Sequence, residues 1–402
     1  MNYLPLSECM ACGGQNLELI LDLGSQPLAN SFKKTFSEKQ EEYPLALNVC
    51  NDCFHCQLTH TVNPDLLFKD YLYVSGTTKT QLDYFEWFTS FVNKYVMPSG
   101  PKKVLDIGCN DGSQLNAFLD RKYETYGVDP AENLYEKSSQ NHNVHCGYFT
   151  GDEFGDIKFD VVLCQNAFAH NTNQLELLRN IKRKLAIGGV FFGTVSQAHM
   201  IENGEFDTMY HEHLSFFNIN SFNELCKRAG LNLIDVQEHE IHGGTLIFIV
   251  SAMQSEQARI DFLINREKSV GLHDKEIYQK FADKAKNTAQ VFKEYIEDQR
   301  NAGAVIVGFG APAKGNTFMN YAGIGPDFII DENPLKQGMY TPGLSVPVYG
   351  VDFLEKYKNT NKLIFVPLAW NFYNEIIGKI KTIRPDKNDT FFRYYPYFEE
   401  TK

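Results

Sequence analysis

The chain has 402 residues, of which 43% are hydrophobic and 22% are charged, and its formal net charge is −12. This length exceeds what one hydrophobic core usually holds, so the composition predicts a globular protein of two or three domains. Because lysines and arginines form no cluster in this acidic chain, nucleic acid is excluded as the main partner, and only a local basic site for a phosphate stays open.

The first cysteines form two Cys-x-x-Cys pairs, Cys9 with Cys12 and Cys50 with Cys53. The N-terminus lacks the features of a signal peptide, and no apolar run reaches the length of a membrane span, so we expect a cytoplasmic protein with reduced thiols. Two such pairs supply the four thiolates that tetrahedral zinc prefers, which predicts one structural ion per chain. Cys56 repeats the same step and competes with Cys53 as the fourth ligand. Buried free thiols are the alternative interpretation.

Residues 1–75 and the central part of the chain have different patterns. Glycine and proline in "LDLGSQPLANSFKK" predict a small N-terminal module of short strands and loops. Apolar residues at helical spacing follow in "LDYFEWFTSFVNKYV". The apolar runs "KKVLDIG", "ETYGVD", "FDVVLCQ" and "VFFGTV" then alternate with helical segments. This alternation predicts an α/β domain with a mostly parallel, doubly wound sheet over residues 76–254.

The last part of the chain begins with a charged stretch, residues 255–300, which predicts one or two helices. A second α/β pattern follows in "GAVIVGFGAPAKGNT", "DFIIDENP", "VPVYG" and "KLIFVPLAW". We therefore expect a third domain, Rossmann-like, over residues 255–402.

A glycine loop, "VLDIGCNDGSQL", follows the first predicted strand of the central domain. A strand, a loop and a helix start in this order bring backbone N–H groups to a ligand, and Asp129, at the end of the next strand, is placed to bind ribose hydroxyl groups. Asp106 and Asp111 would repel a pyrophosphate and suit a cationic cofactor, which favours S-adenosylmethionine over NAD. An ordinary tight turn is the alternative. The predicted cofactor residues in the loop itself are Gly108, Asn110, Asp111 and Gly112.

Another glycine loop, "VGFGAPAKGNT", carries Lys314 after a strand of the last domain. Backbone N–H groups and one lysine suit a phosphate or diphosphate, although the order of residues is not that of a P-loop. A plain turn in a Rossmann-like domain explains the pattern equally well. The candidate ligand residues are Gly310, Lys314, Asn316 and Thr317.

The stretch "TMYHEHLSFF" holds Tyr210, His211, Glu212 and His213. A metal site is disfavoured, because one residue separates the histidines and no helical His-Glu-x-x-His pattern is present. Proton transfer is the second interpretation, and a solvated loop is the third. The residues of this stretch alone do not separate the last two.

The motifs in this order resemble the sugar C-methyltransferases that act on nucleotide-linked 4-keto-6-deoxy sugars. The resemblance covers nearly the whole chain and rests on the four cysteines and on "LGSQPLANSF", "YPLALNVC", "DIGCNDGSQL", "GVDPAENL", "NAFAHN", "YHEHLSFF", "HGGT" and "GAPAKGNT". It implies a zinc-binding domain, a central S-adenosylmethionine-binding domain and a C-terminal Rossmann-like domain.

The resemblance also implies roles for single residues. It favours Cys53 over Cys56 as a zinc ligand, makes His213 the base, and makes Glu212 and Tyr210 its supporting groups. His170 matches a second active-site histidine. The remaining implied residues are Gln165 and Asn166 for the cofactor, and Tyr71 or Tyr73, His242 and Gly243 for the sugar, with Lys314 at the nucleotide diphosphate.

The implied reaction is methyl transfer to C3, which the C4 ketone acidifies. A histidine base near neutral pKa removes the C3 proton, and Tyr210 or His170 donates to the enolate oxygen. No nucleic acid or membrane partner is expected, and a monomer is favoured. O- or N-methylation of a related nucleotide sugar, or a non-enzymatic zinc-containing binding protein, are the competing functions.

Overall fold

The computed structural model describes residues 2–69, 71, 73–96, 100–196, 199–253 and 257–402. The chain folds into two compact units, and it enters each of them more than once. The first unit contains Met1–Glu18, Asn48–Ala198 and Glu212–Asp274, and the second contains Leu19–Leu47, His199–His211 and Lys275–Lys402. The division into domains at 75 and 254 stays a prediction, and residues 254–256 lie outside the described part of the chain. No helix among the described residues has the length and apolar character needed to cross a membrane.

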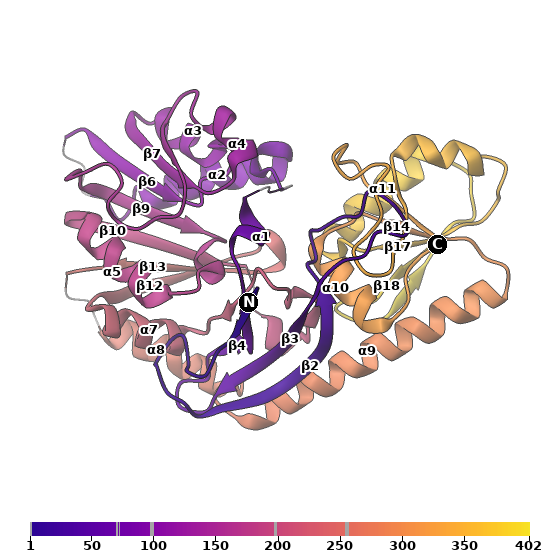
Figure 1. The fold of residues 1–402 in the computed structure, drawn as a ribbon, viewed down its shortest axis with the longest axis horizontal. Helices are drawn as coiled ribbons and strands as arrows, with labels where there is room; N and C mark the ends of the chain where they lie inside the picture. The colour runs from indigo at the N-terminus through magenta and orange to yellow at the C-terminus, as the bar shows by residue number, and fades with distance from the viewer. Residues whose placement is uncertain (1, 70, 72, 97–99, 197–198, 254–256) are drawn as a thin grey trace. The chain divides into compact units, whose positions relative to one another are not determined.

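A seven-stranded sheet forms the centre of the first unit, in the order β12-β13-β10-β9-β6-β7-β8. Strands β10, β9, β6, β7 and β8 are parallel, and β13 runs antiparallel to both β10 and β12. Figure 1 shows β6, β7, β9 and β10 side by side. The bounds are Lys102–Ile107 for β6, Tyr123–Asp129 for β7, Asn143–Cys146 for β8, Phe159–Gln165 for β9, Leu185–Val195 for β10, Asn232–His239 for β12 and Thr245–Ser251 for β13. The four predicted central strands are confirmed.

Helices cover both faces of this sheet, which explains why its central strands contain apolar runs. Phe191 and Phe192 are consecutive in β10 and pack into two different cores, as the two-residue period of a strand requires. The helices of the unit are α1 (Asp65–Phe68), α2 (Lys79–Val92), α3 (Ser113–Leu119), α4 (Glu132–Ser138), α5 (Gln174–Lys184), α7 (Ile219–Ala229) and α8 (Gln257–Ser269), with 3-10 turns η1 (Ser75–Thr77), η2 (Phe168–His170) and η4 (Ile241–Gly243).

The N-terminal strands are longer than the glycine and proline pattern predicts. Strands β2 (Leu17–Pro27) and β3 (Glu42–Cys50) have 11 and 9 residues, so the prediction of short strands is wrong for both. They belong to a four-stranded sheet in the order β11-β4-β3-β2, with β4 at Cys56–Leu58 and β11 at Ser215–Phe216. Gly24 has a φ of 75° inside β2, so the glycine permits an irregular step without ending the strand. Strands β1 (Tyr3–Pro5) and β5 (His60–Val62) pair separately.

The second unit has its own doubly wound sheet, in the order β16-β15-β14-β17-β18-β19. All pairs are parallel except β18 with β19. The strands are β14 (Ile306–Phe309), β15 (Phe328–Ile330), β16 (Val348–Tyr349), β17 (Ile364–Pro367), β18 (Thr390–Arg393) and β19 (Glu399–Thr401). The helices are α6 (Met200–Asn203), α9 (Lys275–Asn301), α10 (Ala313–Ala322) and α11 (Tyr373–Ile383), with 3-10 turns η3 (Phe206–Thr208), η5 (Val351–Tyr357) and η6 (Trp370–Phe372). Figure 1 shows α9 in orange as one long rod, which confirms the predicted helical stretch.

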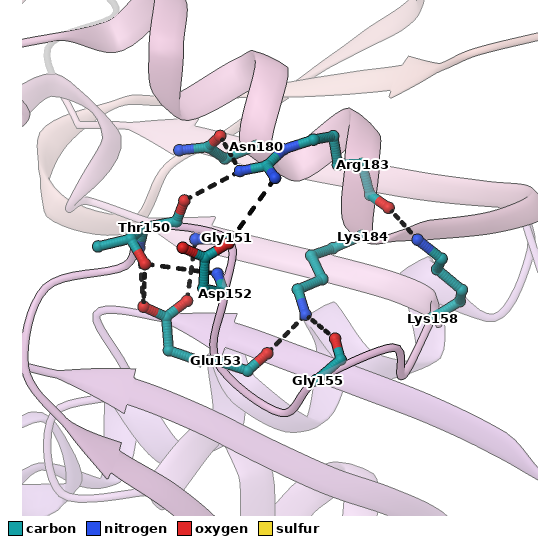
Figure 2. A network of polar contacts seen from close by, with 9 residues as sticks. All are labelled: Thr150, Gly151, Asp152, Glu153, Gly155, Lys158, Asn180, Arg183 and Lys184. Atoms are coloured by element: carbon teal, nitrogen blue, oxygen red, sulfur yellow. Dashed lines mark hydrogen bonds and ion pairs between the residues drawn. The ribbon is translucent and has the colours of Figure 1, made fainter.

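A polar network fixes the loop that precedes β9 (Figure 2). The buried ammonium group of Lys184, the last residue of α5, donates to the backbone carbonyls of Glu153 and Gly155 over 2.5 and 2.6 Å. The Glu153 carboxylate accepts from the backbone N–H groups of Thr150 and Gly151, both at 2.9 Å. These bonds replace the regular structure that the loop lacks and satisfy its buried polar groups.

Candidate active site and metal centre

Four cysteine side chains meet at one point in the first unit. The sulfur atoms of Cys9, Cys12, Cys50 and Cys53 all lie within 4.8 Å of one another. Two of the separations, Cys9 to Cys53 and Cys12 to Cys50, are 3.6 Å. Cys56 is buried in β4 and is not a member of the group. The cluster therefore contains Cys53, the ligand that the resemblance favoured.

The chemistry of this cluster fits a zinc ion. Four sulfur ligands in a closed group match the tetrahedral sites of structural zinc. Burial raises the pKa of the Cys50 thiol to about 12, and the adjacent Cys9 sulfur is the largest cause of a raised pKa at Cys53. Four thiolates at these separations repel one another unless a divalent cation lies among them.

The predicted cofactor loop connects β6 to α3 and is held open by residues in the left-handed region. Gly108 and Gly112 both have a φ of 80°, and Asn110 has a φ of 51°. A Cβ atom on Gly112 would come within 2.9 Å of the His142 ring. The sequence therefore needs glycine at this position, both for its conformation and for space.

Asp129 ties the loop to the end of β7. Its carboxylate accepts from the backbone N–H of Asn110 over 2.7 Å and from that of Ala131 over 2.8 Å. Burial raises the pKa of Asp129. An acid held by two backbone N–H groups at the end of the second strand is oriented to receive ribose hydroxyl groups.

Asp106 lies fully buried at the end of β6. Burial, together with the nearby Asp129, raises the pKa of Asp106 to about 7. Its Oδ1 atom has no hydrogen-bond partner among the described residues. A buried carboxylate oxygen without a partner is costly, and the ammonium group of S-adenosylmethionine would satisfy it. Gln165 ends the adjacent strand β9 and Asn166 follows it. Asn166 Oδ1 also has no partner in the described part of the chain.

Asp111 makes contacts that the sequence did not indicate. Its carboxylate lies 2.7 Å from the Lys137 ammonium group, and it also accepts from the backbone N–H groups of Gly76 and Ser113. Burial raises the pKa of Asp111, but the hydrogen bonds from Lys137 and Ser113 outweigh it, and the net pKa lies below its usual range. Lys137 thus balances the charge of Asp111, so this carboxylate would repel a pyrophosphate less than the sequence predicted.

The segment 73–77 lies against the cofactor loop. The Asn110 side chain donates to the Tyr73 carbonyl over 3.0 Å and accepts from the Ser75 N–H over 2.9 Å. A Cβ atom on Gly76 would overlap Ser113 Oγ and would lie 2.8 Å from Asp111 Oδ2. The predicted cofactor residues Asn110 and Asp111 therefore position this segment through their side chains.

Both predicted histidines of the active site come together in the first unit. The rings of His170 and His213 are stacked, with centroids 5.1 Å apart and planes at 24°. His170 also stacks on Phe68 at 5.6 Å, and burial lowers the pKa of His170 to about 4. His170 is therefore a neutral imidazole near pH 7, with one N–H to donate.

Glu212 receives a hydrogen bond from the Tyr71 hydroxyl over 3.0 Å. Tyr73 is half exposed, and its ring lies 6.5 Å from that of Tyr71. Of the two tyrosines between which the sequence left the choice open, Tyr71 is the one whose hydroxyl bonds to the Tyr-His-Glu-His stretch in the described part of the chain. Gly243 is exposed in η4, and the side chain of His242 lies outside the described part of the structure.

The remaining predicted residues belong to the second unit. Tyr210 is half-buried, and the chain passes from this unit to the first between His211 and Glu212. His211 is buried, and its Nε2 lies 3.2 Å from the Tyr43 carbonyl, which gives this histidine a structural contact. Gly310 has a φ of 79°, as a tight loop after β14 requires.

Lys314 does not extend freely into solvent. Its ammonium group lies 4.1 Å from the centre of the Trp370 ring, whose N–H donates to Asp207 over 2.8 Å. Burial lowers the pKa of Lys314, and burial also raises that of Asp207, to about 7. Asn316 and Thr317 are buried in α10, where Asn316 donates to the Ala29 carbonyl.

Comparisons with known proteins identify the domains of this chain. Three family models match in succession: a zinc binding domain over residues 9–68, a methyltransferase domain over 82–236, and a C-methyltransferase C-terminal domain over 240–396. The C-methyltransferase NovU of Streptomyces niveus is 28% identical over 393 residues, which is 94% of this chain and 93% of the relative. A ubiquinone biosynthesis O-methyltransferase of an Azoarcus species is 23% identical over 37% of this chain and 72% of its own.

Solved structures with a related fold include an S-adenosylmethionine-dependent methyltransferase from Clostridium acetobutylicum, with 11% identity and a TM-score of 0.35, covering 44% of this chain and 94% of its own. The CcbJ methyltransferase from Streptomyces caelestis has 15% identity and a TM-score of 0.35, covering 42% of this chain and 90% of its own. The family models and the nearly full-length relative confirm the predicted enzyme class and its cofactors. The chain belongs to the S-adenosylmethionine-dependent C-methyltransferases that carry an N-terminal zinc-binding domain.

Proposed function

We propose that this enzyme methylates C3 of a nucleotide-linked 4-keto-deoxysugar and that His213 is the base. The sugar comes from the resemblance of the ordered sequence motifs, and C-methylation is supported by the match over residues 240–396. The observation that carries the proposal is the cluster in which His213 stacks on the neutral His170, next to a glutamate that accepts from Tyr71.

The reaction needs a carbon nucleophile. The C4 ketone acidifies the C3 proton, which His213 removes, and the electron pair of the C–H bond moves into the enolate with its charge on the C4 oxygen. The enolate carbon would be the nucleophile for the new C–C bond. Bound S-adenosylmethionine would supply the methyl group and a positive sulfur that takes the electron pair of the broken methyl–sulfur bond.

His170, Glu212 and Tyr71 have distinct proposed roles. His170 is neutral and retains an N–H, so it can donate to the developing enolate oxygen without adding a full charge. Tyr210 is the second candidate for this donation. Glu212 would orient the base or support its charged form, and the hydrogen bond from Tyr71 fixes the carboxylate for that purpose.

The groups at the ends of β6 and β7 are proposed to hold the cofactor. Asp129 would accept from the ribose, and Asp106 with Asn166 would accept from the ammonium group, because the latter two have unpartnered buried oxygens in the described part of the chain. Gly108 and Gly112 permit the close approach of the backbone.

The loop at Gly310 is proposed to hold the nucleotide diphosphate. No side chain caps the N-terminus of α10, so its first backbone N–H groups can take phosphate oxygens. Lys314 would add a positive charge, which already interacts with the Trp370 ring and with Asp207. Tyr71, Tyr73, His242 and Gly243 remain the proposed contacts of the sugar.

A product analysis tests this function. The purified enzyme is incubated with S-adenosylmethionine and, separately, with dTDP-, GDP- and CDP-linked 4-keto-6-deoxy sugars, and the methylated carbon is located by NMR. We expect one of these sugars to gain a methyl group on C3. A methyl group on oxygen or nitrogen, or no transfer to any member of the panel, would contradict the proposal.

A further inference from the structure

The stacked histidines lie on two segments of the first unit that a single backbone bond connects. Leu214, which follows His213, donates its N–H to the carbonyl of Ala169, which precedes His170, over 3.0 Å. The Leu214 carbonyl in turn accepts from the Leu58 N–H over 2.9 Å. The peptide next to the proposed base is therefore held on one side by the His170 segment and on the other by the N-terminal zinc-binding region.

Strand β4, whose Leu58 bonds to Leu214, follows the second Cys-x-x-Cys pair in the chain. Ser215 and Phe216 of β11 pair in antiparallel register with Gln57 and Cys56 of β4. Three residues upstream of Cys56, Cys53 contributes its sulfur to the cluster. Hydrogen bonds from Cys50 N–H to the His55 carbonyl and from Phe54 N–H to the Cys50 carbonyl fold the intervening turn. We call residues 50–58 the knuckle platform.

Ser215 joins this platform to both histidine segments. Its hydroxyl donates to Gln174 Oε1 over 3.1 Å, and it lies 3.1 Å from Nε2 of His55. Gln174 is the first residue of α5, shortly after His170. His55, Ser215 and Gln174 are 0%, 0% and 1% exposed, so water does not replace a lost partner at this site.

Further bonds fix the same platform to the chain after β11. Asn218 and Asn220 donate from their side chains to the carbonyls of Phe54 and Cys53, over 2.8 and 3.1 Å. Arg228 donates to the Ala11 carbonyl, next to Cys12, over 2.6 Å. The platform is thus bonded at Phe54 and Cys53 to the segment that follows His213, and Ala11, beside the first cysteine pair, is bonded to α7.

We infer that the knuckle platform positions the two active-site histidines and that Ser215 is the positioning residue that connects them. This inference rests on the proposed roles of His213 and His170. Proton removal from carbon needs the base within a narrow range of positions, and a displacement of about 1 Å can lower a rate about 10²-fold. The zinc-binding domain would thus contribute to catalysis through geometry, without touching the substrate.

The test uses the full chain loaded with zinc and S-adenosylmethionine and isotope-labelled at histidine. The ring resonances of His170 and His213 are assigned with His170→Asn and His213→Asn and are then compared between the wild type, Ser215→Ala and Ser269→Ala. Ser269 is exposed on α8, where its hydroxyl donates to the carbonyl of Arg266, so Ser269→Ala makes the same chemical change away from the platform.

We expect Ser215→Ala to shift both ring resonances while zinc stays at about one per chain and the affinity for S-adenosylmethionine stays within about twofold. Methyl transfer should fall about 10²-fold, and Ser215→Thr, which keeps the hydroxyl, should restore part of it. If Ser215→Ala does not fold, His55→Gln and His55→Leu replace it. Gln keeps a donor toward Ser215 and Leu does not, so only Leu should shift the resonances.

Unchanged resonances of His170 and His213 in Ser215→Ala, or in His55→Leu, would overturn the inference. The same holds if every histidine resonance shifts and zinc and cofactor binding are lost together, because that result indicates a general loss of stability. Shifted resonances with unchanged methyl transfer would support the platform and would instead contradict the assignment of His213 as the base.

Discussion

The Tyr71 hydroxyl donates a hydrogen bond to Glu212 Oε2 over 3.0 Å, and these two residues are 141 positions apart in the chain. Tyr71 also exchanges two backbone hydrogen bonds with the side chain of Asn133, which follows the cofactor strand β7. One tyrosine therefore connects the residue next to the proposed base with helix α4, which follows the strand of the proposed cofactor site.

We expect Tyr71→Phe to lower kcat about tenfold, because the variant removes a hydrogen bond to a charged carboxylate that orients the base. The pH profile of kcat should also shift, since the electrostatic environment of His213 changes. Steady-state kinetics over a range of pH values measure both effects. Tyr135→Phe, at an exposed position on α4, is the control that should leave kcat and its profile unchanged. An unchanged profile in Tyr71→Phe would remove Tyr71 from the account.

The lowered pKa of His170 should make the protein less stable in mild acid. Burial lowers the pKa of His170 from 6.5 to about 4, so below pH 6.5 the unfolded chain binds a proton that the folded chain does not. Stability therefore falls as the pH drops from 6.5 toward 4, by up to about 1.4 kcal/mol per pH unit for this group. In His170→Asn that part of the slope should disappear.

Urea unfolding at a series of pH values measures the slope for the wild type, His170→Asn and His145→Asn. His145 is exposed on β8, so its replacement should leave the slope as it is. Equal slopes in the wild type and His170→Asn would show that the fold does not hold His170 neutral.

Gly76→Ala tests the contact between segment 73–77 and the cofactor loop. Gly76 has a φ of −80°, which alanine adopts without strain, so the effect comes from the overlap of the new Cβ with Ser113 and Asp111. We expect the affinity for S-adenosylmethionine to fall about tenfold as the loop shifts. Gly378→Ala is the matched control, since its Cβ meets open space in α11. Calorimetry measures this affinity. Equal values for Gly76→Ala and the wild type would contradict the proposed coupling between segment 73–77 and the cofactor loop.

Lys184→Met tests the network of Figure 2. The variant keeps most of the apolar stem and leaves the carbonyl oxygens of Glu153, which is buried, and of Gly155 without the donor they share. We expect a loss of about 1–3 kcal/mol in the free energy of unfolding, measured in urea. Lys182 is exposed in the same helix, and Lys182→Met should change the stability by less than about 0.5 kcal/mol. An unchanged free energy of unfolding in Lys184→Met would show that other contacts hold this loop in place.

The sequence predicted local features well. Each Cys-x-x-Cys pair brings its two sulfur atoms together within one turn. The prediction of the metal cluster therefore required only that the two pairs lie next to each other in the fold. The strands β6, β7, β9 and β10 each contain an apolar run because both faces of their sheet are covered, and that pattern is visible in the sequence.

Partners that are distant in the chain were not predictable. Nothing in "YLYVSG" indicates that Tyr71 reaches Glu212, and nothing near Asp111 indicates that Lys137 balances its charge. The glycine loop predicts that the Lys314 ammonium group is free to bind a ligand. In the structure this group interacts with Trp370 and Asp207, which are distant from it in the sequence. The role of Ser215 likewise depends on the pairing of β11 with β4. A strand of two residues leaves no pattern in the sequence from which this pairing could be predicted.

The most direct test of the central claim is hydrogen exchange at C3 of the sugar. The wild type and His213→Asn are each incubated in deuterated water with the best methyl acceptor of the nucleotide-sugar panel, and deuterium at each carbon is followed by NMR. The account predicts enzyme-dependent deuterium uptake at C3 for the wild type and none above background for His213→Asn, while both bind S-adenosylmethionine with similar affinity. Uptake at C3 that persists at the wild-type rate in His213→Asn would contradict the assignment of His213 as the base.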